Sequence, residues 1–202
     1  MKARRKKAQV GEKSAKKSEP LCIFTIGHSN RTIYAFLELL QAHGVKRLVD
    51  IRTIPRSRHN PQFNSDTLGK SLRAAGIDYK PMKELGGLRH AQRDSINTGW
   101  KNASFRGFAD YMQTPEFAAA IDKLIEIAGA GKPTAIMCAE AVPWRCHRSL
   151  VGDALVARGV DVQDIMSATR AQPHEMTSFA RVRGAEITYP LQGNLPLQDM
   201  ES

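Results

Sequence analysis

The segment 137–148 holds most of the groups in this chain that could carry out chemistry. Two thiols, a carboxylate, an imidazole and two guanidiniums stand between an apolar run and a helical pattern. They belong to Cys138, Glu140, Arg145, Cys146, His147 and Arg148. So many reactive and anion-binding groups are unusual in a loop with a purely structural role. We therefore expect an active or ligand-binding site here, although the segment alone does not define a reaction.

Cys146 is the expected nucleophile or redox-active group of this site. It stands at the start of a predicted helix over 147–158 and has cationic neighbours. A helix N-terminus and nearby cations both favour thiolate over thiol. The alternative is a half-buried cysteine that packs under the loop. Cys138 ends an apolar strand, where it would be a small core residue or, at the edge of a pocket, a ligand contact.

Charged residues elsewhere could bind an anion beside these thiols. Asp50 and Arg52 stand two apart on a predicted strand, so both face the same side and the acid could orient the guanidinium. The alternative is a structural salt bridge. Planar guanidiniums bind phosphate or carboxylate in a bidentate manner, and Arg56, Arg58 and Arg148 could add to the anion pocket. Glu140 could act as a general acid or base, or pair with Arg52 or Arg148.

Two histidines are candidates for the same site. His147 could serve as a base for Cys146 or as a ligand contact, but adjacent side chains on a helix point about 100° apart, which disfavours a direct couple. His28 is therefore the expected catalytic partner. A metal site built from Cys138, Cys146, His28 and Glu140 is an alternative, although cysteines eight positions apart do not have zinc-knuckle spacing. The sequence assigns no metal and leaves the cofactor unknown.

An alternation of strands and helices must position these groups. Apolar runs predict strands over 21–26, 45–51, 77–80, 134–138 and 160–165. Apolar residues at helical spacing, with capping residues and glycine stops, predict helices over 32–44, 65–76, 114–128 and 147–158. This pattern predicts one compact α/β domain over 20–190. We expect a mostly parallel sheet with helices on both faces and a short antiparallel hairpin at 181–189.

The predicted fold gives the candidate residues a common location. Ligands of open α/β sheets bind beyond the carboxyl ends of the strands. His28, Asp50, Cys138 and Glu140 end or follow three different predicted strands, so the expected site is a composite pocket at that edge. The long polar segment 81–102 contains glycines and could be a lid or binding loop.

The chain is basic, but its charge is concentrated at one end. Residues 1–19 carry +6 of the net +10 and have no apolar pattern, which predicts a disordered tail. This tail could contact nucleic acid in a salt-sensitive manner, or it could only keep the chain in solution. A second, C-terminal tail is expected over residues 191–202. No apolar run reaches the roughly 20 residues that span a bilayer, so no membrane partner is expected. Three cysteines define no disulfide framework, which favours the cytoplasm.

Several multi-residue motifs run in order from about residue 23 to residue 190. They are Thr25-Ile26-Gly27-His28-Ser29, Leu48-Val49-Asp50-Ile51-Arg52, Pro55-Arg56-Ser57-Arg58 with Pro61 and Phe63, Leu85-Gly86-Gly87, Cys138-Ala139-Glu140 with Pro143, Cys146-His147-Arg148, and Ala180-Arg181-Val182 to Tyr189-Pro190. In these motifs the chain resembles the "domain of unknown function 488" family of bacterial and archaeal proteins. The resemblance implies the family's compact α/β fold and no particular activity, because none is established for the family.

Two functions of different classes are consistent with these residues. The first is an enzyme that binds and acts on a small anionic or nucleotide-like ligand. Its arginines would hold the anion, and Cys146, Glu140 or His28 would carry the chemistry. The second is a non-catalytic binding or sensor module that uses the same pocket, with the basic tail adding a contact to nucleic acid.

Overall fold

The computed structural model describes residues 20–191. The predicted basic tail, and all but the first residue of the predicted C-terminal tail, lie outside this range. The described residues form a six-stranded sheet and a separate two-stranded sheet. The large sheet has the order β3-β2-β4-β1-β5-β6, in which β6 is antiparallel to β5 and the other neighbours are parallel. Its strands are β1 (Cys22–Gly27), β2 (Arg47–Asp50), β3 (Asp78–Pro81), β4 (Thr134–Cys138), β5 (Asp161–Ser167) and β6 (Arg170–Pro173).

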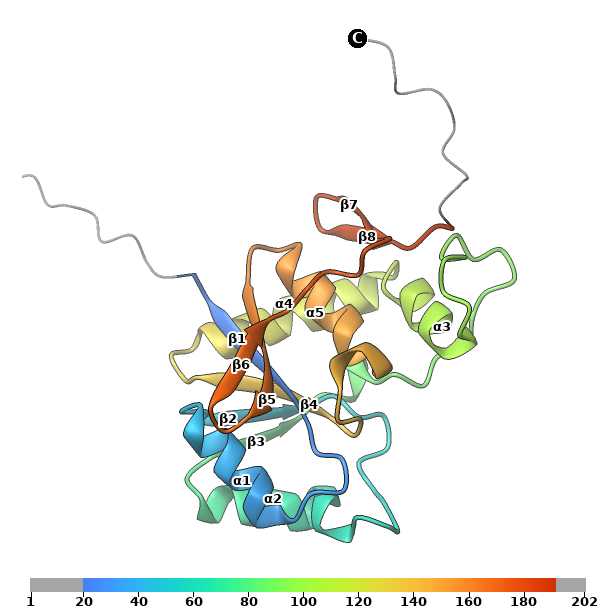
Figure 1. Cartoon of the computed structure of the whole chain (residues 1–202). Coiled ribbons are helices and arrows are strands. Elements are labelled where there is room, and N and C mark those ends of the chain that lie inside the picture. Colours follow the sequence, from blue (N-terminus) through green and yellow to red (C-terminus); the bar gives the residue numbers. More distant parts are fainter. Residues whose placement is uncertain (1–19, 192–202) are drawn as a thin grey trace, which may run out of the picture.

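Helices cover both faces of the large sheet (Figure 1). One face packs against α1 (Ile33–Ala42) and α2 (Ser65–Ala74), and the other against α3 (Ala103–Tyr111), α4 (Pro115–Gly129) and α5 (Arg148–Val156). The predicted capping residues begin two of these helices. Thr32 accepts a hydrogen bond from the backbone N–H of Ala35, and Thr114 accepts one from that of Phe117. The predicted α/β class, with a mostly parallel sheet and helices on both faces, is confirmed.

Successive residues of the central strand point to opposite faces of the sheet. In β4, Ala135 and Met137 pack in the core under α1 and α2, whereas Ile136 and Cys138 belong to the core under α4 and α5. Cys138 therefore stands at the carboxyl end of a central strand and points toward the α5 side.

The C-terminal hairpin is confirmed, and two further elements were not predicted. β7 (Arg181–Arg183) and β8 (Glu186–Thr188) pair antiparallel around Gly184, whose φ is +57°. The unpredicted β6 is a short polar strand that lacks the apolar alternation of a strand signal. The unpredicted α3 contains Gly107 and follows a polar segment. Its one start signal is Asn102, whose side chain accepts two backbone N–H bonds.

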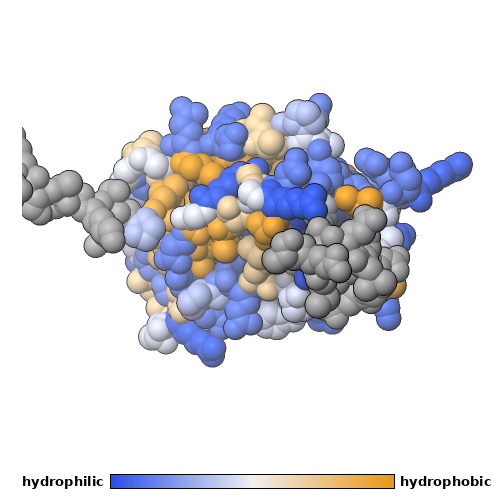
Figure 2. Space-filling view, turned by 90° about the horizontal axis from the view of Figure 1, so that it is seen from above, coloured by the Kyte–Doolittle hydropathy of each residue, from blue (hydrophilic) through white to orange (hydrophobic). Residues whose placement is uncertain are grey.

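The surface on the side of the β7–β8 hairpin is mixed in character. Apolar side chains gather in the middle of this face, and hydrophilic side chains border them (Figure 2). Between residues 20 and 191, no helix is both long enough and apolar enough to span a bilayer.

Candidate functional site

Three neighbouring strands, β2, β4 and β1, bring their carboxyl ends side by side. In the parallel register Gly27 is paired with Cys138, and Asp50 is paired with Met137. The chain continues this pairing beyond the sheet, because the backbone N–H of His28 donates to the carbonyl oxygen of Cys138 at 3.0 Å. The loops that carry the predicted site residues therefore start from one edge.

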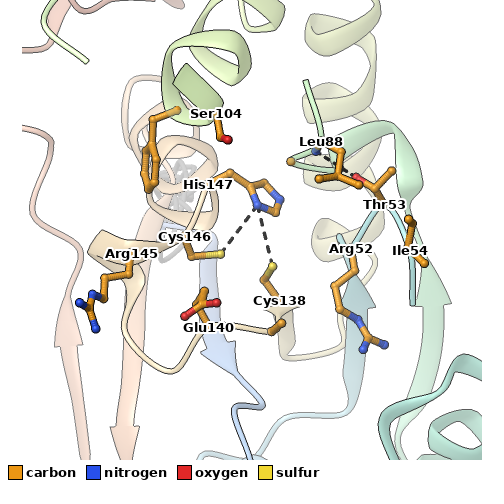
Figure 3. A pocket seen from close by; sticks show the side chains of 13 residues that line it. Arg52, Thr53, Ile54, Leu88, Ser104, Cys138, Glu140, Arg145, Cys146 and His147 are labelled. Atoms are coloured by element: carbon orange, nitrogen blue, oxygen red, sulfur yellow. Dashed lines mark hydrogen bonds between the residues drawn. The ribbon is translucent and has the colours of Figure 1, made fainter. Parts of the chain in front are cut away.

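Cys138, Cys146 and His147 form a compact cluster at this edge (Figure 3). The Nδ1 atom of His147 lies 3.7 Å from Sγ of Cys146 and 3.8 Å from Sγ of Cys138. These three atoms all lie within 4.8 Å of one another. Both cysteines are buried and free of disulfide bonds, and His147 is half-buried. The histidine beside the two thiols is thus His147, and not the expected His28.

A direct contact between Cys146 and His147 was expected to be disfavoured, and this expectation was wrong because Cys146 is not helical. Cys146 follows a short 3₁₀ helix, η3 (Pro143–Arg145), and its backbone is extended, with φ −135° and ψ 142°. The separation of about 100° applies only to neighbours within a helix, and α5 begins after both residues, at Arg148. The extended backbone therefore allows both side chains to face the same point.

The His147 ring is held in one orientation. Its Nε2 atom lies 3.0 Å from the carbonyl oxygen of Leu85, which can only accept, so Nε2 carries the hydrogen of the uncharged ring. The lone pair on Nδ1 then faces the two sulfur atoms. The centroids of the Phe108 and His147 rings lie 4.9 Å apart, and Gly87 lies against the Nδ1 side of the His147 ring. The imidazole is therefore positioned as an acceptor or metal ligand.

The two thiols have different acidities. A hydrogen bond from the Cys138 thiol is the main cause that lowers the pKa of Cys146 to about 7. The charge and the backbone N–H of Arg148 lower this pKa further, whereas burial raises it. That N–H lies 3.4 Å from Sγ of Cys146. The same bond to Cys146, together with burial, raises the pKa of Cys138. Cys146 is therefore the sulfur of the pair that ionises first.

His28 is occupied by other partners. Its Nδ1 atom donates to the carbonyl oxygen of Ser29 at 2.7 Å, and its Nε2 atom accepts from Nη1 of Arg52 at 3.2 Å. The ring also stacks on Phe63, with centroids 4.2 Å apart. Burial is the main cause that lowers the pKa of His28 to about 4, and the charges of Arg52 and Arg31 add to it. In this arrangement His28 is an uncharged residue that supports Arg52.

Asp50 and Arg52 form a buried bidentate pair. The Nε and Nη2 atoms of Arg52 donate to the two carboxylate oxygens of Asp50 at 2.8 and 2.6 Å. Nη2 also donates to the carbonyl oxygen of Phe63 at 2.8 Å, and the Tyr79 hydroxyl donates to Asp50 at 2.7 Å. With the bond to His28, four of the five N–H groups of Arg52 have partners within the described part of the chain. One N–H on Nη1 is left for a ligand.

The remaining predicted site residues have unlike surroundings. Arg148 is buried and donates to the carbonyl oxygens of Glu140 and Ala141, at 3.0 and 3.4 Å, so it supports the loop after β4. Glu140 is exposed, and its carboxylate has no ion pair among residues 20–191. Arg58 is also exposed and lines neither of the two cavities at this edge.

Two cavities adjoin at the carboxyl edge of the sheet. The thiol pocket, of about 390 Å³, is lined by the cysteine and histidine cluster together with Thr53, Gly87, Leu88, Ser104, Phe105 and the shared residues below. The arginine pocket, of about 610 Å³, is lined by His28, Ser29, Asn30, Arg56, Ser57, Asn60, Ala141 and the same shared residues. Five residues line both cavities: Arg52, Ile54, Ala139, Glu140 and Arg145.

Several pocket residues were not expected from the sequence. Arg145 lines both cavities, although its position beside Cys146 suggested only a cationic neighbour. Gly87 and Leu88 come from the segment 81–102, which was expected to be a lid or binding loop and does line the thiol pocket. Ser104 and Phe105 come from α3, whose one start signal, Asn102, was not used to predict a helix there.

Comparisons with known proteins identify the chain at the level of its family. Comparison with curated proteins and with solved structures gave no match. The family match spans the segments that carry Asp50, Arg52 and the cysteine and histidine cluster, but begins after His28. The model of the family described as "Domain of unknown function DUF488" matches residues 32–155, more than half of the chain, and the chain therefore belongs to this family.

Proposed function

We propose that the protein binds a small anionic ligand across the two adjoining pockets and acts on it at the cysteine and histidine cluster. The observation that carries this proposal is that five residues line both pockets. The arginines and the thiols therefore face connected space. A ligand whose phosphate or carboxylate lay among the arginines would place a neighbouring group beside Cys146.

The charges around the arginine pocket favour an anion. Arg52, Arg56 and Arg145 line it, and Glu140 is the one acid among the lining residues that the structure describes. Guanidinium groups bind phosphate and carboxylate in a bidentate manner. Arg52 is also fixed by Asp50 before any ligand arrives, which lowers the entropic cost of binding.

The thiol pocket supplies the reactive end of the site. Cys146 ionises first of the two thiols, and its sulfur lies with His147 at the wall of the cavity (Figure 3). Glu140 lies in the wall that the two pockets share and is exposed, so its carboxylate could move a proton to or from a bound ligand.

A comparison of two alkylating reagents tests this proposal. Iodoacetate and iodoacetamide deliver the same electrophilic carbon, but only iodoacetate carries a carboxylate. In the full chain with a metal chelator present, we expect the iodoacetate-to-iodoacetamide rate ratio at Cys146 to exceed that of a free thiol several-fold. Inorganic phosphate should lower this ratio. Because both reagents meet the same thiol at one pH, the ratio does not depend on its ionisation. Peptide mass spectrometry locates the modified residue.

Arginine variants provide matched controls for this experiment. Arg145→Ala and Arg56→Ala remove a cation from the arginine pocket and should bring the rate ratio toward that of a free thiol. Arg58→Ala removes an exposed arginine outside both pockets and should leave the ratio unchanged. A wild-type ratio equal to that of the free thiol, with no effect of phosphate, would contradict the proposal.

Two further aspects of the function are proposed. We place the protein in a reducing compartment such as the cytoplasm, because Cys22, Cys138 and Cys146 are all free. The basic tail lies outside the described residues, and its contact with nucleic acid stays a prediction. Deletion of 1–19 should lower the affinity for nucleic acid and flatten its salt dependence. Unchanged affinity would remove that role.

A further inference from the structure

We infer that Cys138, Cys146 and His147 bind a zinc ion whose fourth coordination position opens onto the thiol pocket. Thiolate and imidazole are preferred ligands of zinc, and sites with three protein ligands leave one position for water or substrate. Metal binding requires only these three residues. The role of the open position in ligand binding rests on the proposed function.

The two sulfur–nitrogen distances within the cluster match a tetrahedral zinc site. With Zn–S bonds of about 2.3 Å and Zn–N bonds of about 2.0–2.1 Å, tetrahedral angles place sulfur and nitrogen about 3.6 Å apart. The Nδ1 atom of His147 lies 3.7 Å from one sulfur and 3.8 Å from the other. In a metal-free arrangement Nδ1 would accept from one thiol only, because it has one lone pair and the Cys138 thiol donates to Cys146. A shared ion satisfies all three atoms.

His147 has the outer partner that is typical of a metal-bound histidine. Its Nε2–H donates to the carbonyl oxygen of Leu85 at 3.0 Å, which directs the Nδ1 lone pair at the cluster. Ligating histidines almost always donate their other N–H to a carbonyl, a carboxylate or water, which fixes both tautomer and ring orientation. Figure 3 shows Cys138 and Cys146 directing their sulfur atoms toward this ring.

The charges of a zinc site fit the burial of the cluster. Cys138 and Cys146 are 7% and 3% exposed, so two uncompensated thiolates would be costly there. A divalent cation neutralises both thiolates, and their protons leave to solvent when the metal binds. The backbone N–H of Arg148 already donates to Sγ of Cys146 at 3.4 Å, which stabilises a thiolate ligand.

The open position indicates the class of ligand. It faces the thiol pocket, whose wall contains Glu140, Arg52 and Arg145. A phosphate ester could present one oxygen to the metal while Arg52 and Arg145 hold its negative charge. The inferred ligand is therefore an anionic ester.

Metal analysis and cobalt substitution test the zinc site. We expect about one zinc per chain when the full protein is purified reduced and without chelator. Metal-free protein titrated with Co²⁺ should show a thiolate-to-cobalt charge-transfer band and the intense visible bands of four-coordinate cobalt. Cys138→Ser and His147→Gln should each lower zinc affinity more than roughly 100-fold. This loss is larger than the roughly 10–100-fold loss that follows when only a hydrogen-bond partner of a ligand is removed. Circular dichroism checks that each variant is folded.

Matched substitutions outside the cluster complete the test. Cys22→Ser removes the other free cysteine, and His59→Gln removes an exposed histidine; both should bind zinc like the wild type. Wild-type protein without stoichiometric zinc and without the thiolate-to-cobalt band would overturn the inference, even where a variant fails to fold. Zinc binding that survives His147→Gln would also overturn it.

The two proposals fail separately. Zinc binding without anion-selective alkylation contradicts the proposed function alone. Anion-selective alkylation in a chain that binds no zinc contradicts the zinc site alone. Arg145→Ala should keep the zinc and lose the selectivity, because Arg145 lines both pockets but is not part of the cluster.

Discussion

Gly87 lies directly against the imidazole ring of His147. A Cβ atom at position 87 would come 2.6 Å from the Cγ atom of the ring and closer still to Nδ1. The φ of Gly87 is not positive, and the three atoms nearest to such a Cβ all belong to this ring. We expect Gly87→Ala to displace His147 and lower zinc affinity roughly 10–100-fold. Competition with a chromophoric chelator measures this change.

Gly129 provides the control for this prediction. A Cβ atom there meets nothing within 4 Å, so Gly129→Ala should leave zinc affinity unchanged. If Gly87→Ala binds zinc as tightly as the wild type, the position of His147 is not needed for metal binding and the cluster geometry has another role.

Arg148 should contribute to stability through the loop that it supports. Its guanidinium donates to the carbonyl oxygens of Glu140 and Ala141 from a buried position. Lysine keeps the charge but cannot reproduce the two-pronged geometry. We expect Arg148→Lys to lower the free energy of unfolding by about 1–3 kcal/mol, measured by urea denaturation. Arg73→Lys changes an exposed arginine and should have little effect. Equal stabilities of the two variants would show that the loop does not depend on Arg148.

His174 should make stability depend on pH. Its nitrogens lie 2.9 Å from Asp153 and 3.2 Å from Asp164, so both donate and the ring is charged. Burial alone would lower the pKa of His174, but the two carboxylates outweigh it and raise the pKa to about 9. Relative to about 6.5 in the unfolded chain, this difference corresponds to about 3 kcal/mol. The stabilisation is complete below pH 6.5 and is lost as the pH rises from about 6.5 to 9.

Urea denaturation between about pH 6 and pH 9 tests this dependence. His174→Gln should be about 3 kcal/mol less stable than the wild type near pH 6, and the difference should narrow toward pH 9. His59→Gln replaces an exposed histidine and should follow the wild type throughout. A stability difference for His174→Gln that stays constant over this range would show that His174 is not charged in the folded protein.

The layers of the fold could be predicted because periodicity reports burial. The alternation of apolar strands with amphipathic helices indicated a mostly parallel sheet covered on both faces. The order of the strands could not be predicted from periodicity. β4 lies between β1 and β2, and this order depends on contacts between residues that are distant in sequence. The polar β6 and the glycine-containing α3 carried too little apolar pattern to be recognised.

The sequence indicated that the candidate residues lie at one edge of the sheet, but the contacts among them depended on local backbone geometry. The strand ends indicated that Asp50 and Cys138 would lie close together, and the register confirms this. The partner of Cys146 could not be predicted from an assumed helix. Pro143 begins η3 and delays the start of α5, so the backbone at Cys146 is extended and His147 reaches both thiols. That proline was the signal that sequence reasoning did not use.

We propose that a small anion binds where the arginine and thiol pockets meet. A crystal structure of the full chain grown with inorganic phosphate tests it most directly. We predict a phosphate within hydrogen-bond distance of Arg52 and Arg145, on the side that faces Cys146. Phosphate found only at exposed arginines such as Arg58, with both pockets empty of anion, would contradict the account.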